Sequence, residues 1–209
     1  MYEKFEKNIY VPENWKCHTL ISSKEIKKYC DLNLIGKTIT ALRIVGYNYT
    51  FSKEYGCLLG SERNFIDTDL FSRSSEIDTP LLILLNDGTQ FEIDILESWV
   101  YNLSLNQIPY DIKDYWDNTN IDANILFAPC IGQKIISVEY EEEHTDNRVF
   151  IGEYKYKGPD YINSIILRFE DGNGLKLYGY IDFFEIEYID HNNIVQNITY
   201  SELKRALLQ

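Results

Sequence analysis

Short runs of alternating hydrophobic and polar residues recur along the chain, a pattern that predicts β-strands buried on one face. Residues 81–86 and 89–97 are two such runs on either side of an Asp-Gly dipeptide, which is typical of a hairpin turn. In the second run, Glu92 and Asp94 alternate with apolar residues. We therefore expect a β-hairpin whose apolar side chains face a core while these two carboxylates face water.

The rest of the chain predicts further strands and a few short helices. Strands are expected at residues 37–47, 134–142, 148–156, 161–169, 175–181 and 183–189. Ser22 and Glu25 fit a capping box, which predicts a short helix that ends near residue 29. Residues 199–202 repeat that pattern before a C-terminal helix. The polar residues 61–79 predict a long loop, and residues 106–128 predict a connecting segment that is helical or irregular.

Two blocks of the sequence recur and predict an internal duplication. The segment Ile-Gly-Lys-Thr-Ile at residues 35–39 returns as Ile-Gly-Gln-Lys-Ile at residues 131–135, which is 96 positions later. The hairpin at residues 81–95 returns at residues 165–179, which is 84 positions later, so the first copy carries a 12-residue insertion between residues 47 and 80. The alternative is chance similarity among isoleucine-rich strands, because an Asp-Gly turn between two strands is common.

These elements predict an α+β fold of mostly antiparallel β-sheets with a few short helices. Residues 1–106 would form the first half with an N-terminal extension, and residues 107–209 would hold the connecting segment, the second half and a C-terminal helix. Each half alone leaves one face of its sheet bare, so we expect two similar halves that share a core about a pseudo-twofold axis in one compact unit. Two separable domains are the alternative.

The charge of the chain narrows the classes of partner. Its 209 residues include 33 acidic and 20 basic ones, which gives a net charge of -13 at pH 7. A field of this sign repels phosphates and anionic lipids, so we expect neither direct nucleic-acid binding nor membrane binding. The same field attracts a basic protein, and acidity that serves only solubility is the alternative. The oligomeric state stays open.

The N-terminal sequence mixes both charges and has no long apolar run, unlike a signal peptide. We therefore expect a cytoplasmic protein of a bacterial cell. The four cysteines, at positions 17, 30, 57 and 130, form no CxxC pair, so neither a zinc site nor a redox motif is indicated and no cofactor is expected.

An acidic run at residues 139–146 is the strongest candidate for metal chemistry. On a strand, Glu139, Glu141 and Glu143 project to one side and Glu142 projects to the other, so the carboxylates do not converge on one ion. The favoured interpretation is a solvated acidic strand edge, and no metal ligand is assigned.

The histidines offer no catalytic motif. His18, His144 and His191 lie in different predicted loops, and none accompanies a recognisable nucleophile motif. We therefore lean against an enzyme and assign no catalytic residue, the alternative being a catalytic group that assembles only in three dimensions.

Acidic and tyrosine residues recur together in the second half. Tyrosine gives a large, rigid contact area and carboxylates attract basic partners, so the combination is suited to protein binding. The candidate contact residues are Glu139, Glu141, Glu143, Asp146, Tyr178, Tyr180, Glu185 and Glu187. The alternative is that the tyrosines only fill a core between two layers.

In composition and size the chain resembles the class of acidic immunity proteins, which neutralise a basic toxin. We therefore predict a non-catalytic binding protein of the immunity or inhibitor type, which neutralises a basic protein through an acidic, tyrosine-rich sheet face. One alternative is a small-molecule-binding protein or enzyme with its site in the cleft between the halves. Another is a structural or assembly protein of the phage type.

Overall fold

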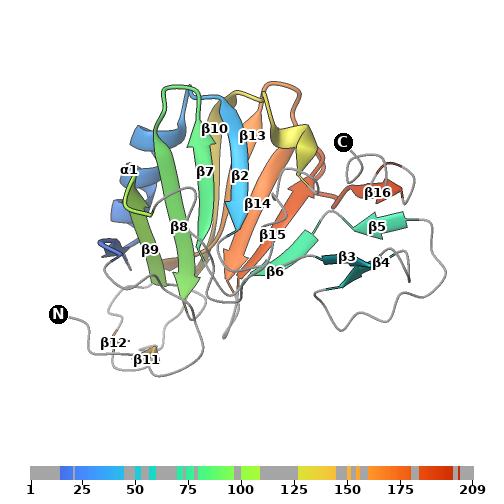
Figure 1. The fold of residues 1–209 in the computed structure, drawn as a ribbon. Helices are drawn as coiled ribbons and strands as arrows, with labels where there is room; N and C mark the ends of the chain where they lie inside the picture. Colours follow the sequence, from blue (N-terminus) through green and yellow to red (C-terminus); the bar gives the residue numbers. More distant parts are fainter. Residues whose placement is uncertain are drawn as a thin grey trace.

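Two five-stranded antiparallel sheets form the body of the protein (Figure 1). The computed structural model describes residues 15–20, 22–44, 50–52, 57–59, 70–72, 74–77, 80–96, 100–108, 127–144, 150–151, 154–155, 160–179, 184–199 and 202. The first sheet contains, in spatial order, β1 (His18–Leu20), β9 (Val100–Leu105), β8 (Gln90–Leu96), β7 (Leu81–Leu85) and β2 (Ile39–Ile44). The second contains β10 (Ile135–His144), β13 (Asp160–Phe169), β14 (Gly174–Gly179), β15 (Phe184–Ile189) and β6 (Ser74–Ile77). The predicted predominance of antiparallel sheet is confirmed.

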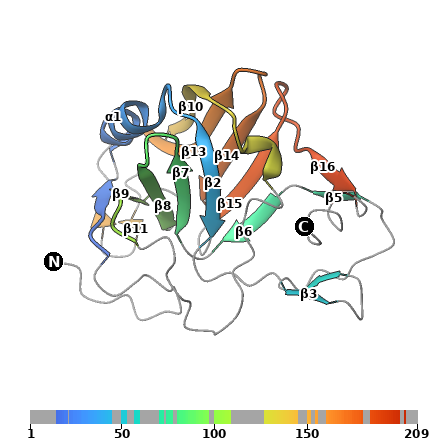
Figure 2. The same ribbon diagram turned by 45° about the horizontal axis from the view of Figure 1, so that its top comes forward.

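The remaining described strands form two-stranded ribbons. They pair as β3 (Thr50–Ser52) with β4 (Cys57–Leu59), β5 (Leu70–Ser72) with β16 (Asn197–Thr199), and β11 (Phe150–Ile151) with β12 (Tyr154–Lys155). The described helices are α1 (Ser23–Leu34) and the 3-10 turn η1 (Ala128–Cys130). Figure 2 shows α1 beside β10, where Lys27 Nζ lies 2.7 Å from Glu142 Oε2. No helix in the described part of the chain is long and apolar enough to cross a membrane.

The two sheets pack face to face and share one core. Apolar side chains from both sheets and from α1 form a single buried cluster, whose members include Ile26, Leu42, Phe91, Leu167 and Ile186. Tyr101 of the first sheet is fully buried and donates its hydroxyl to the carbonyl of Ile162 in the second sheet, at 3.3 Å. Burial of each large apolar side chain contributes about 1.5 to 3 kcal/mol. Apolar burial is therefore the main interaction that holds the sheets together.

Helix α1 begins where the sequence predicts but is longer than predicted. Ser22 is the N-cap residue, yet its side chain makes no capping hydrogen bond, so the predicted capping box is wrong there. The helix continues past residue 29 because Ile26, Cys30 and Leu34 follow each other at four-residue spacing and are all buried against the core. The apolar face of the helix, and not its first turn, determines its length.

The second predicted capping box, at residues 199–202, is present. Thr199 N donates to Glu202 Oε2 at 2.9 Å, and Glu202 N donates to Thr199 Oγ1 at 3.3 Å. The helix predicted after it lies outside the described residues, as do residues 109–126 of the predicted connecting segment.

The hairpin predicted around the Asp-Gly dipeptide is confirmed. Strands β7 and β8 pair across a turn in which Gly88 has a φ of +81°, a conformation that favours glycine. Lys37 Nζ lies 2.9 Å from Asp87 Oδ2, and Asp87 Oδ1 accepts the Thr89 N–H at 2.9 Å. The hydrogen bond from Lys37, followed by those from Thr89, lowers the pKa of Asp87 to about 2.

The loop predicted at residues 61–79 contains two strands, so that prediction is wrong for its C-terminal part. Strand β5 pairs with β16, and β6 pairs with β15 at the edge of the second sheet. The sequence of β6, Ser-Ser-Glu-Ile, is mostly polar, and it forms a strand because pairing with a neighbour outweighs residue preference at a sheet edge. Strand β6 belongs to residues 1–106, yet it completes the second sheet.

The two Ile-Gly segments lie side by side and pair with each other around a bridge between Thr38 and Lys134. Gly36 N donates to Ile135 O and Gly132 N donates to Ile39 O, both at 2.8 Å. The two bonds are equivalent under the 96-position shift, which relates the donor Gly36 to the donor Gly132 and the acceptor Ile39 to the acceptor Ile135. A further pair of bonds is related in the same way, namely Ile39 N to Gln133 O and Ile135 N to Lys37 O.

The strand registers of the two sheets also correspond. The β2–β7 pair begins at Ile39 and the β10–β13 pair begins at Ile135, and a β-bulge follows each of these residues. The registers match as far as the third strand of each sheet, which is β8 in the first and β14 in the second. The pairing of that strand with the fourth differs, because the register of β14 with β15 is one residue away from that of β8 with β9. The internal duplication itself stays a prediction, and these registers are the observations that bear on it.

Candidate functional site

The second sheet has a face that points away from the shared core. Along β13 and β14, core residues such as Ile165 and Leu177 alternate with residues of the opposite face. We call this the outer face, and its described residues include Glu139, Glu141, Glu143, Ser164, Ile166, Arg168, Lys176, Tyr178, Glu185 and Glu187. Cross-strand pairing orders one row across it, which is Glu139, Ile166, Lys176 and Glu187. Paired strands therefore hold these side chains in a fixed order.

Six of the eight contact residues predicted from the sequence lie on the outer face. They are Glu139, Glu141, Glu143, Tyr178, Glu185 and Glu187. The other two, Asp146 and Tyr180, lie outside the described residues. In the sheet, β10 and β15 lie on either side of β13 and β14. The outer face therefore carries carboxylates from two strands that are distant in the sequence. Their role in binding stays a prediction.

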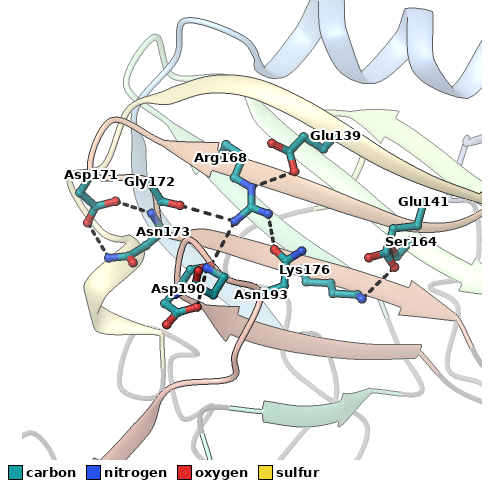
Figure 3. Close-up of polar contacts among 11 residues, drawn as sticks. Glu139, Glu141, Ser164, Arg168, Asp171, Gly172, Asn173, Lys176, Asp190 and Asn193 are labelled. Atoms are coloured by element: carbon teal, nitrogen blue, oxygen red, sulfur yellow. Dashed lines mark hydrogen bonds and ion pairs between the residues drawn. The ribbon is translucent and has the colours of Figure 1, made fainter.

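Arg168 fixes one end of the outer face (Figure 3). Its Nε donates to Glu139 Oε2 at 2.9 Å, and its other nitrogens donate to the carbonyls of Gly172 and Asp190 and to Asn193 Oδ1. Only 10% of the Arg168 side chain is exposed. The guanidinium therefore joins two turns to the sheet and serves a structural purpose.

Lys176 lies nearer the middle of the outer face and pairs with Glu141 (Figure 3). Its Nζ is 2.8 Å from Glu141 Oε2 and 5.4 Å from the centre of the Tyr178 ring. Ser164 Oγ donates to the same carboxylate oxygen at 2.6 Å. Burial acts to raise the pKa of Glu141, but the bonds from Lys176 and Ser164 outweigh it and leave that pKa below its ordinary value.

Tyr178 lies between two carboxylates of β15. Its hydroxyl oxygen is 2.8 Å from Glu185 Oε2 and 3.2 Å from Glu187 Oε1. The hydroxyl has one proton, so it stabilises one carboxylate at a time. Burial, followed by the charge of Glu185, raises the pKa of Glu187. Two like charges are therefore held close together on a partly exposed surface.

Three carboxylates of the outer face have no cation of their own in the described part of the chain. Glu185 and Glu187 share the Tyr178 hydroxyl, and Glu143 accepts from the hydroxyl of Tyr161 and the side-chain amide of Asn163. Five glutamates of the face have described side chains, and the two described cations, Arg168 and Lys176, pair with the other two of these glutamates. A net negative charge thus remains toward solvent.

The corresponding face of the first sheet is buried, so one prediction is wrong. Glu92 is 0% exposed and Asp94 is 2% exposed, although the alternating pattern predicted that both face water. Trp15 and Ile108 pack with Leu82 on this face. Alternation shows which side chains share a face of a strand, but it does not show whether another segment covers that face. The alternation in β8 and in β14 is alike, so it did not indicate that the face of β8 opposite the core is covered while that of β14 is partly exposed.

Five hydrogen bonds hold the Glu92 carboxylate. The donors are the side chains of Trp15, Gln90 and Ser104 and the backbone N–H groups of Gln107 and Ile108. Both backbone bonds end on Oε1 and measure 2.7 Å. A buried carboxylate is costly unless such bonds replace its hydration. Glu92 therefore fastens Trp15 and the segment after β9 to the sheet.

The nearby thiol of Cys17 is not activated. Burial raises the pKa of Cys17, the charges of Asp94 and Glu92 raise it further, and a hydrogen bond with Thr19 acts in the opposite direction. The thiol is therefore protonated at neutral pH and is a poor nucleophile. Cys30 lies fully buried in the core, where burial likewise raises its pKa.

Metal ligands do not gather in the part of the chain that the structure describes, where no group of three or more His, Cys, Asp or Glu side chains could hold an ion. His18 is exposed beside Tyr29, with ring centres 5.7 Å apart. His191 is exposed in the turn after β15, with Nε2 at 3.0 Å from Asn192 Nδ2. His18 belongs to β1 of the first sheet and His191 to a turn that follows the second sheet, and the side chain of His144 lies outside the described residues.

Comparison of the chain with protein-family models, with curated proteins and with solved structures found no match. Function is therefore inferred from the geometry and charge of the outer face.

Proposed function

We propose that the protein is a non-catalytic, acidic binding protein of the immunity or inhibitor type, which neutralises a basic protein through the outer face of the second sheet. The observation that carries this proposal is the group formed by Tyr178, Glu185 and Glu187, in which two adjacent carboxylates share one hydroxyl and form no ion pair with a described residue. The proposal keeps the cytoplasmic location and the bacterial origin expected from the sequence.

Charge and rigidity both favour such a partner. The described side chains of the outer face include five glutamates and two cations, and the net charge of -13 extends the attraction beyond contact distance. The carboxylates project from paired strands, so little conformational freedom is lost when a partner contacts them. Burial, followed by repulsion from Glu185, raises the pKa of Glu187, and a lysine or arginine placed beside the two carboxylates would relieve the repulsion.

The size of the outer face fits the centre of a protein interface. Four strands about 4.8 Å apart, with about six residues each at roughly 3.3 Å per residue, span about 400 Å² in projection. A typical specific interface buries about 800 Å² per partner. We therefore place the outer face at the centre of the contact, with further contacts around it.

We further propose that the chain is an internal duplication, with halves at residues 1–106 and 107–209 related by a pseudo-twofold axis in one compact unit. The hydrogen bonds exchanged between the two Ile-Gly segments support this, because a shift of 96 positions interconverts them. The matching β-bulges after Ile39 and Ile135 support it independently. The edge strands β1 and β6 do not follow the shift. They occupy equivalent edges of the two sheets, next to β9 and β15, but they come from parts of the sequence that the shift does not relate.

The duplication gives a reason to assign binding to the second sheet. The 84-position shift relates Glu92 of the first sheet to Lys176 of the second, so the covered face and the outer face are equivalent surfaces. Trp15 and Ile108 cover the first of these surfaces within the chain. The equivalent second surface is left partly exposed, which supports its use for a partner.

A charge-matched comparison tests the proposed face. The probe is a fluorescently labelled oligolysine peptide, and the variant E185Q/E187Q is compared with the control E25Q/E170Q, which removes two exposed carboxylates elsewhere. We expect the first variant to weaken binding about fivefold or more, because two close contacts of about 0.5 to 1 kcal/mol each are lost. The control should change binding by less than about twofold, since distant charges are screened by salt. Equal effects of the two variants would sink the assignment to this face.

A further inference from the structure

The outer face already contains an ammonium group that belongs to the chain itself. Lys176 Nζ lies 2.8 Å from Glu141 Oε2 and 5.4 Å from the centre of the Tyr178 ring. Lys176 is also the direct cross-strand partner of Glu187. A carboxylate and an aromatic ring are the two kinds of group that recognise a lysine ammonium, so Lys176 makes the contacts that a basic partner would make.

Lys176 differs from Arg168, the other cation of this face, in how firmly it is held. Arg168 donates to four groups, two of which are main-chain carbonyls, and it is 10% exposed. Among the described residues, Lys176 forms an ion pair with Glu141 alone; the Lys176 side chain is 20% exposed and that of Glu141 is 43% exposed. A lysine stem has several rotatable bonds, so its ammonium can leave Glu141 while the backbone of β14 stays in place. Arg168 cannot move in this way without breaking two turns.

We propose that Lys176 is a built-in competitor, whose ammonium occupies the place on the outer face that a lysine side chain of the basic partner takes in the complex. This inference rests on the proposed function, because it concerns the same face. Partner binding displaces Lys176 from Glu141, and the lost ion pair reduces the net gain from each new contact. Lys176 thereby sets the number of contacts that binding requires. A partner with several clustered cations makes enough contacts to displace Lys176, and an isolated surface lysine does not.

The chain offers a closely matched control in Lys27. Its Nζ lies 2.7 Å from Glu142 Oε2 and 5.4 Å from the centre of the Tyr140 ring. The two lysines therefore have the same kinds of partner at nearly the same distances, but Lys27 belongs to α1 and contacts the edge strand β10 away from the outer face. The variants K176Q and K27Q each remove one positive charge, one ion pair and one contact with a tyrosine ring.

The experiment measures the affinity of wild type, K176Q, K27Q and K176R for the labelled oligolysine peptide by fluorescence anisotropy, at low and at raised salt. We expect K176Q to bind about fivefold more tightly than wild type, since it vacates a contact site as well as removing a charge. K27Q should gain less than about twofold, because its charge is screened from the face. K176R keeps the charge and should stay within about twofold of wild type.

Two results would overturn the proposal in distinguishable ways. In the first, wild type binds the peptide in a salt-dependent way, and K176Q and K27Q gain affinity equally. This result contradicts the competitor role of Lys176 and leaves the proposed function standing. No binding by any of the four proteins contradicts both. Far-ultraviolet circular dichroism of each variant shows whether it is folded. Where K176Q unfolds, K176M takes its place, because it also removes the charge and carries the same expected gain in affinity.

Discussion

Replacement of Glu92 by alanine should destabilise the protein strongly, although glutamate on a sheet face is usually tolerant of change. Glu92 is 0% exposed, and its carboxylate accepts five hydrogen bonds. Alanine removes the two oxygens that accept all five bonds. The effect depends on which donors find another partner.

The contacts around Glu92 allow the cost to be worked out. Trp15 Nε1 keeps Ser104 Oγ at 2.5 Å, and Gln90 Nε2 keeps the carbonyl of Ile108 at 2.6 Å. The backbone N–H of Gln107 belongs to an exposed residue, so water can replace its acceptor. Ile108 is 3% exposed and Ser104 is 2% exposed, so the Ile108 N–H and the Ser104 hydroxyl are stranded, and each costs about 1 to 3 kcal/mol. The buried methylene adds about 0.8 kcal/mol, which gives a loss of at least about 3 kcal/mol in unfolding free energy.

Urea unfolding followed by circular dichroism measures this loss. Glu170→Ala is the control, because the Glu170 side chain is 64% exposed and lies 3.7 Å from Lys134 Nζ, a surface pair worth about 0 to 1 kcal/mol. We expect the E92A midpoint to fall well below that of E170A. An E92A protein within about 0.5 kcal/mol of E170A would refute the buried network, since even one stranded donor costs more than that.

Two further predictions concern the paired segments and the outer face. Gly36→Ala and Gly132→Ala should each lower the unfolding free energy by about 1 kcal/mol and by equal amounts, because both glycines have a φ near +84° and an added Cβ meets nothing within 4 Å; clearly unequal losses would contradict their equivalence. Burial, followed by the charge of Glu185, raises the pKa of Glu187, so the Glu187 carboxyl binds its proton more tightly in the folded state than in the unfolded state. The stability gained from this proton is present below the ordinary pKa of glutamate, and it is lost as the pH rises through the raised pKa of Glu187. Glu187→Gln should therefore melt at a higher temperature than wild type at pH 7 and at the same temperature below about pH 4, and a constant difference at all pH values would exclude this cause.

The parts of the fold that were predicted correctly depend on local pattern. The hairpin of β7 and β8 follows from alternation around an Asp-Gly turn, and the grouping of Glu139, Glu141 and Glu143 on one face follows from the period of a strand. The length of α1 was also encoded locally, because Cys30 and Leu34 continue the helical spacing of its buried face. That signal was present in the sequence beyond the predicted end of the helix.

Two other wrong predictions concern elements whose structure depends on contacts between distant segments. Glu92 and Lys176 occupy similar positions in similar hairpins, and only the packing of Trp15 and Ile108 makes the first of them buried. Strand β6 has a polar sequence and becomes a strand because β15 offers an edge to pair with. Neither outcome follows from the residues of the element itself.

The most direct test of the proposed binding face is a titration of the isotope-labelled protein with the oligolysine peptide, followed by the chemical shifts of the backbone amides. If the outer face binds the basic partner, the largest changes will fall in β14 and β15, at Lys176, Tyr178, Glu185 and Glu187, and they will diminish with added salt. Amides of β9 and of α1 should change little, because those elements lie away from the outer face. Changes concentrated in α1 or the first sheet, or no saturable change in β14 and β15, would contradict the assignment.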